Sequence, residues 1–269
     1  MPCAAQRCSD TVGNRITLPE HVVTTCPKSR ISLGLVALAV AAAVHAGGPT
    51  GGFRNGFEPL VANTVQDIQQ GVATGAVYLP GRVVTAVSAD RKNLWIADSA
   101  AAALQQGVFV IRGSSAAVLP PEIVVGTHIT VFGSAAEFDV GVPPQGDTLT
   151  QIENHALGVA SLSNFTPAPL QLSTVSQLAS IVDGEPYEGV LVRVANLRVL
   201  STASGNRITV GDNIGSTIVL DDDAGSIGLP PVGTCYGSVT GVMHLSVVEN
   251  ERRMLPRGLA DAVAGNSCN

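Results

Sequence analysis

Alternating apolar and polar residues predict β-strands along most of this chain. The clearest case is "YEGVLVRVANLRVL", where Val190, Val192 and Val194 fall on one side of a strand and the phase shifts near Asn196, as a bulge would cause. Further strands are predicted at "GAVYLPGRVVTAV", "NLWIAD" and "GVFVIRG", with Gly- and Pro-containing turns between them. Because β-branched residues dominate these segments, we predict an all-β protein.

The strand pattern occurs twice. "VVGTHITVFG" at Val124–Gly133 and "PVGTCYGSVTG" at Pro231–Gly241 both place Val-Gly-Thr before a short β-like run that ends in Gly. In each half the motif follows three strands and a Pro-containing loop, and one more strand comes after it. Five strands closed as a small Greek-key barrel describe the OB-fold, whereas an immunoglobulin-like sandwich needs about seven. We predict two tandem five-stranded OB-like Greek-key barrels at 64–165 and 183–269, with a flexible lead-in at 47–63 and a linker at 166–182.

A basic flank and an apolar run lie near the N-terminus. Lys28 and Arg30 precede the apolar run Ile31–Val44, and small residues at Val44 and Ala46 stand before Gly47. This order is typical of a secretory signal, and the run is short for a membrane span of about 20 residues. We expect residues 1–46 to be an N-terminal extension and signal peptide, cleaved near Ala46. The mature protein would then be secreted or periplasmic. An uncleaved anchor and a native start later than Met1 are the alternatives.

Cysteine content and charge fit this interpretation. Three of the five cysteines fall in the expected extension, which leaves Cys235 and Cys268. An even pair in an oxidising compartment predicts a disulfide, with two unpaired thiols as the alternative. The chain has 15 basic and 21 acidic residues, and the extension contains more basic than acidic ones. The mature chain would therefore be acidic, which argues against strong non-specific nucleic-acid binding.

The first half resembles the OB-fold modules that precede the catalytic domain in secreted bacterial endonuclease/exonuclease/phosphatase-type nucleases. The resemblance rests on "DIQQG", "GRVVTAV", "NLWIAD", "GVFVIRG", "VGTHITVFGSAAEF" and "LTQI", and the second half resembles the following module through "YEGVLVRVANLRV" and "RRMLPRGLADAV". It covers about Thr64 to Val263. These nucleases owe their activity to a separate C-terminal domain, and we expect no such domain here. The resemblance implies a binding or scaffolding module, with an oligonucleotide or extracellular DNA as ligand.

A nucleic-acid platform is predicted on the second and third strands of the first barrel. If the residues flanking Trp95 and Phe109 point into the barrel, both rings point out, onto the face that OB-folds use for ligands. Exposed rings there would stack on bases, whereas buried rings filling a core are the more common alternative. Four nearby basic residues are candidates to contact phosphates: Arg82, Arg91, Lys92 and Arg112.

Metal and catalytic chemistry have little support in the sequence. Asp221, Asp222 and Asp223 are the best candidate metal ligands, but calcium needs 6–8 oxygens, and a solvated turn is the alternative. The histidines of the expected mature chain, His128, His155 and His244, lack metal-ligand spacing, and no Gly-x-Ser-x-Gly elbow occurs. We therefore expect a binding module with no catalytic site and no cofactor. A structural or interaction module for a glycan or a partner protein is the alternative to nucleic-acid binding, and a nuclease remnant is a third possibility.

Overall fold

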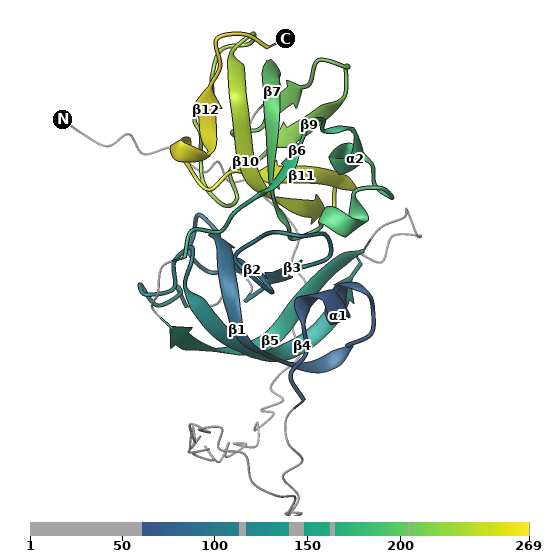
Figure 1. The fold of residues 1–269 in the computed structure, drawn as a ribbon, viewed down its shortest axis with the longest axis vertical. Helices are drawn as coiled ribbons and strands as arrows, with labels where there is room; N and C mark the ends of the chain where they lie inside the picture. Colours follow the sequence, from purple (N-terminus) through teal and green to yellow (C-terminus); the bar gives the residue numbers. More distant parts are fainter. Residues whose placement is uncertain (1–60, 113–116, 140–147, 162–164, 204, 269) are drawn as a thin grey trace, which may run out of the picture. The chain divides into compact units, whose positions relative to one another are not determined.

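The structure is a computed structural model that describes residues 61–112, 117–139, 148–161, 165–203 and 205–268 (Figure 1). Both barrels belong to one compact unit, which spans Gly56–Asn269. The expected signal segment lies outside the described residues. Within them, no helix combines the length and the apolar character that a membrane crossing requires.

The first half forms a closed five-stranded barrel. Its strands neighbour one another in the order β1-β2-β3-β5-β4, and β4 returns to β1. The pair β3–β5 is parallel and the other pairs are antiparallel. A short helix precedes the barrel, with Thr64 and Asp67 forming a reciprocal capping box. The elements are α1 (Val65–Gln69), β1 (Gly75–Val87), β2 (Leu94–Ala97), β3 (Gly107–Val110), β4 (His128–Phe138) and β5 (Leu149–Ser161).

The second half repeats this arrangement. Its five central strands close in the order β7-β8-β9-β11-β10, again with one parallel pair, β9–β11. They are β7 (Leu191–Thr202), β8 (Ile208–Gly211), β9 (Thr217–Leu220), β10 (Cys235–Ser246) and β11 (Glu251–Leu255). The smaller elements are β6 (Leu170–Leu172), α2 (Ser176–Ala179), η1 (Glu185–Tyr187), η2 (Leu259–Asp261) and β12 (Ala262–Ala264). The predicted all-β fold with two five-stranded barrels is confirmed.

The segment expected to be a linker, 166–182, contributes to the second barrel. It contains β6, which pairs in parallel with β7, and it contains α2. Leu178 of α2 is fully buried in the core of the second barrel, with Leu170 and Leu172 of β6 packed against that core. The segment is therefore part of the barrel's sheet and core, because its alternate leucines are covered there.

The repeated Val-Gly-Thr motif forms the same turn in both barrels. Gly126 and Gly233 have φ angles of +91° and +92°, which favour glycine. The Gly126 amide donates to the Val84 carbonyl at 2.8 Å, and the Val84 amide donates to the Thr127 carbonyl at 2.9 Å. Val199 makes the same two bonds with Gly233–Thr234, at the same distances. The motif thus closes the first strand of each barrel onto the start of its fourth strand.

Three apolar clusters make up the core. One fills the first barrel and one fills the second. The third joins the two barrels, and its members come from both: Ala86, Trp95, Phe109, Leu149, Leu191, Ala224, Val242, Leu245 and Leu255. Residues on both faces of β2 and β3 are therefore buried, one face inside the first barrel and the other against the second.

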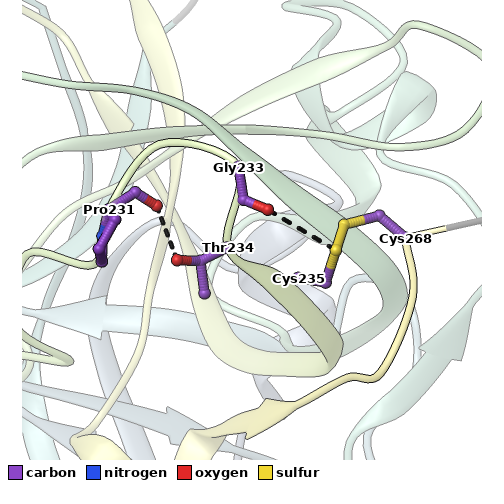
Figure 2. Close-up of a disulfide and its surroundings, with 5 residues drawn as sticks. All are labelled: Pro231, Gly233, Thr234, Cys235 and Cys268. Carbon is purple, nitrogen blue, oxygen red and sulfur yellow. Dashed lines mark hydrogen bonds between the residues drawn. A yellow bond between two sulfur atoms is a disulfide. The ribbon is translucent and has the colours of Figure 1, made fainter.

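The predicted disulfide is present (Figure 2). Cys235, the first residue of β10, is bonded to Cys268 in the C-terminal tail, and their Cα atoms are 5.2 Å apart. Beside it, the Thr234 hydroxyl donates to the Pro231 carbonyl at 2.7 Å, which belongs to the turn described above. The bridge ties the tail to the fourth strand of the second barrel.

Candidate functional site

The outer face of β2 and β3 is covered by the second barrel. Trp95 and Phe109 do point away from the core of their own barrel, as the alternation predicts, because Leu94 and Ile96 occupy that core. Yet Trp95 is only 2% exposed and Phe109 only 8%. The His244 ring of β10 lies against both, with centroid distances of 5.7 and 5.0 Å. The interpretation of these rings as an exposed stacking platform is therefore wrong, since the second barrel buries them.

A pocket of about 390 Å³ remains at the edge of this contact. The first barrel supplies its β1–β2 loop and the outer face of β2 and β3, and the second supplies β10 and the loop after β9. Strands two and three and the first loop are the parts of an OB-fold that bind oligonucleotides and oligosaccharides, and the volume lies in the usual range for ligand pockets. The lining residues are Ser88, Ala89, Asp90, Asn93, Trp95, Phe109, Asp222, Asp223 and His244.

The β1–β2 loop is held in place by its own polar residues. The Ser88 hydroxyl donates to Asp90 Oδ1 at 2.6 Å and accepts from the amides of Lys92 and Asn93. The Ala89 amide donates across to the Asp223 carbonyl of the second barrel at 2.7 Å. These bonds fix one wall of the pocket relative to the other.

The opposite wall carries the acidic triplet after β9. Asp221 is buried, and its Oδ2 accepts from Arg207 Nε at 3.1 Å and from Arg253 Nη1 at 2.8 Å, so its charge is compensated. Asp222 accepts from Asn206 Nδ2 at 2.7 Å. Desolvation of the Asp223 carboxyl and the neighbouring charges of Asp221 and Asp222 raise the pKa of Asp223. Ligand atoms of the three residues lie within 4.8 Å of one another.

Two ring nitrogens at the pocket have no hydrogen-bond partner among the described residues. These are Trp95 Nε1 and His244 Nδ1, both shielded from bulk solvent. Burial and the nearby charge of Arg253 lower the pKa of His244 to about 4, so the ring is neutral at neutral pH. An indole N–H can only donate, and a buried polar group without a partner costs about 1–3 kcal/mol. A ligand that offers an acceptor to Trp95 would recover this free energy.

The predicted phosphate-binding residues do not line the pocket. No basic residue is among the described residues that line the pocket. Arg82 is paired with Asp98 at 3.1 Å, and Arg91 and Arg112 donate to backbone carbonyls of their own barrel. Lys92 interacts with Asp90. The hydrogen bond from Ser88 is the largest cause that lowers the pKa of Asp90, and the backbone amide and charge of Lys92 lower it further. These four residues therefore do not join Trp95 and Phe109 in lining the pocket.

The sequence did not point to Asp90, Asn93 or His244 as site residues. His244 stands alone in the sequence, and it meets Trp95 only because the two barrels pack together. Of the residues expected from the sequence, Trp95, Phe109, Asp222 and Asp223 do line one pocket, in a combination that was not anticipated. No protein-family model matches this chain, and a search of curated proteins finds no significantly similar sequence.

Proposed function

We propose that this protein is a ligand-binding module whose pocket between the barrels takes a neutral, hydroxyl-rich ligand, such as one sugar unit of a glycan. The observation that carries the proposal is that Trp95, whose indole N–H has no partner among the described residues, lines the same pocket as Asp223. A hydroxyl group both donates and accepts, so neighbouring hydroxyls serve the carboxylate and the indole at once. An ammonium group can only donate and would leave Trp95 unpartnered.

The pocket's charge and shape support a sugar over a nucleotide. Asp90, Asp222 and Asp223 make it acidic, and phosphate groups would be repelled there. The Trp95 and Phe109 rings are packed against each other and against His244, which leaves no open ring face for base stacking. The oligonucleotide implied by the sequence resemblance is therefore not proposed for this pocket, and the glycan alternative takes its place.

We further propose that the protein works in an oxidising compartment, as a secreted or periplasmic protein. The disulfide between Cys235 and Cys268 supports this, because such bonds persist outside the reducing cytosol. The basic flank and apolar run before Gly47 support it from the sequence. Partition of a tagged protein between cell, periplasm and medium tests the compartment.

The first prediction concerns Asp223→Asn, a change that keeps the side chain's shape and removes its charge. The full chain would be screened on a glycan array, and the best saccharide would then be titrated by calorimetry. A hydrogen bond to a charged group contributes about 1.5–3 kcal/mol, so we expect the variant to bind at least about tenfold more weakly. Asp183→Asn is the matched control, because Asp183 is exposed on the second barrel and does not line the pocket.

The salt dependence of binding, measured for saccharides and for labelled DNA and RNA, distinguishes a glycan-binding module from a nucleic-acid-binding module. Sugar binding should change little with salt, whereas binding of labelled DNA or RNA would weaken with salt through counterion release. Salt-sensitive binding of oligonucleotides without saccharide binding would overturn the proposal in favour of a nucleic-acid module. Absence of saccharide binding across the array, or equal losses in the two variants, would also overturn it.

A further inference from the structure

The pocket between the barrels has acidic residues on both of its walls. Asp90 comes from the β1–β2 loop of the first barrel, and Asp222 and Asp223 come from the loop after β9 of the second. The Ala89 amide donates to the Asp223 carbonyl at 2.7 Å, so the two acidic loops are in direct contact here. Three acidic residues from two barrels therefore line one space of about 390 Å³.

The nearby arginines compensate a different carboxylate. Arg207 Nε and Arg253 Nη1 lie 3.1 and 2.8 Å from Asp221 Oδ2, and none of these three residues is among the described residues that line the pocket. Of the acidic triplet that the sequence named as candidate metal ligands, Asp221 is thus already paired. Asp222 and Asp223 remain for the pocket, and like charges close together repel each other. A neutral sugar alone supplies no charge to offset this repulsion, whereas a cation does.

A second feature of the same pocket, separate from its acidic residues, calls for a ligand. Trp95 is only 2% exposed, it lines the pocket, and its indole N–H has no partner among the described residues. Buried polar groups without partners are rare in folded proteins and need an explanation such as a bound molecule. Because the indole can only donate, a bare cation does not satisfy it. A cation together with an oxygen-bearing ligand satisfies both the carboxylates and the indole.

We propose that this pocket binds a calcium ion through Asp90, Asp222 and Asp223, and that hydroxyl groups of the sugar complete the coordination of the ion. Calcium takes about 6–8 oxygen ligands in flexible geometry, so three carboxylates leave positions for hydroxyl and water oxygens. Another hydroxyl of the same sugar would accept from Trp95. Magnesium fits less well, because it demands a near-ideal octahedron and gives up its waters reluctantly. The role of the sugar hydroxyls rests on the proposed function, whereas the ion site rests on the carboxylates.

The second prediction is that the full chain binds terbium, a luminescent substitute for calcium, beside Trp95. This residue is the chain's one tryptophan, and its indole transfers excitation energy only to an ion that lies nearby. We expect tryptophan-sensitised terbium luminescence that saturates and that calcium displaces more readily than magnesium. In calorimetry, Asp222→Asn should weaken calcium binding at least about tenfold. Asp183→Asn should leave it unchanged, because Asp183 is exposed and does not line the pocket.

Saccharide titrations with calcium and with the chelator EDTA separate this inference from the proposed function. Saccharide binding that EDTA abolishes and calcium restores would support both. Calcium binding without binding of any saccharide would support the ion site and overturn the proposed function. Saccharide binding that EDTA leaves unchanged, or a lack of saturable terbium luminescence, would overturn the ion site.

The variants provide a further check on the ligands. Equal calcium affinity in Asp222→Asn and Asp183→Asn would overturn the assignment of the carboxylates. If Asp222→Asn fails to fold, Asp90→Asn provides the same test from the other barrel, because an asparagine there can still accept from the Ser88 hydroxyl. Calcium binding retained in full by that variant would likewise contradict an ion held between the two loops.

Discussion

At the scale of single residues, the Glu188 side chain of the second barrel is hydrogen-bonded to the first barrel. It is 1% exposed, and its Oε1 accepts from the Thr150 amide of β5 at 2.7 Å. Its Oε2 accepts from Arg252 Nη1 of β11 at 3.3 Å, and Arg252 also pairs with Glu185. Burial, reinforced by the charge of Glu185, raises the pKa of Glu188 to about 8. A buried carboxyl that is protonated near neutral pH makes the junction sensitive to pH.

The third prediction follows from the sign of this shift. Because the folded pKa of about 8 lies above the ordinary value of 4.5, the folded state binds more protons than the unfolded state between these pH values. This carboxyl therefore lowers the free energy of unfolding as pH rises through that window, by up to about 1.4 kcal/mol per pH unit. Glu188→Gln keeps an acceptor for Thr150 and cannot ionise.

The measurement is urea unfolding of the full chain and of Glu188→Gln at several pH values from 5 to about 8. We expect the variant's free energy of unfolding to fall less steeply with pH than that of the unmodified protein. Identical slopes for the two proteins would show that Glu188 ionises with an ordinary pKa, and the linkage described above would then be wrong.

At the scale of elements, the start of β3 and the entry to β7 touch through two glycines. A Cβ added to Gly107 would lie 2.1 Å from the Gly189 carbonyl oxygen, which is backbone and cannot swing away. Gly189 has a φ of +69°, and a Cβ there would lie 2.5 Å from the Gly107 carbonyl carbon. Only glycine at both positions permits this close approach of the two backbones, so any larger residue would push the start of β3 and the entry to β7 apart.

The fourth prediction is that Gly107→Ala destabilises the protein by about 2 kcal/mol or more, because the methyl group forces the two segments apart. Gly158→Ala in β5 is the matched control, since a Cβ there meets nothing within 4 Å. The control should stay within about 1 kcal/mol of the original stability. Thermal and urea unfolding of both variants measure the difference, and equal stability of the two would contradict the packing described.

The elements themselves were largely predictable, because short-range patterns determine them. The inward phase of β7 shifts at Asn196 as its sequence indicates: Val192 and Val194 are buried before it, and Leu197 and Val199 after it. Asn196 takes a φ of +55°, a conformation that asparagine tolerates better than most residues. What could not be predicted is the cover over Trp95 and Phe109. Alternation gives the side of a strand on which a residue lies, and it says nothing about what packs there.

At the scale of the whole molecule, the third apolar cluster joins the two barrels. Leu245 and Val242 of β10 are fully buried against Trp95 and its neighbours. Separating the barrels would expose these side chains to water, which costs about 25 cal/mol of free energy for each Å² of apolar surface exposed. It would also break the Glu188 and Ala89 hydrogen bonds that cross the junction. Each barrel has its own core, but separating the barrels would also expose the third apolar cluster that lies between them.

The fifth prediction uses Trp95, the chain's one tryptophan, as a reporter placed within this junction. In urea, Trp95 fluorescence and far-ultraviolet circular dichroism should change with the same midpoint, because separation and unfolding occur together. Leu245→Ala removes a fully buried side chain from the cluster and should lower the free energy of unfolding by about 2–5 kcal/mol, with both probes still coincident. A fluorescence change that precedes the loss of β-structure would show instead that the barrels separate first. The pocket between them would then exist only below that urea concentration, and ligand binding would stabilise the junction before it stabilised either barrel.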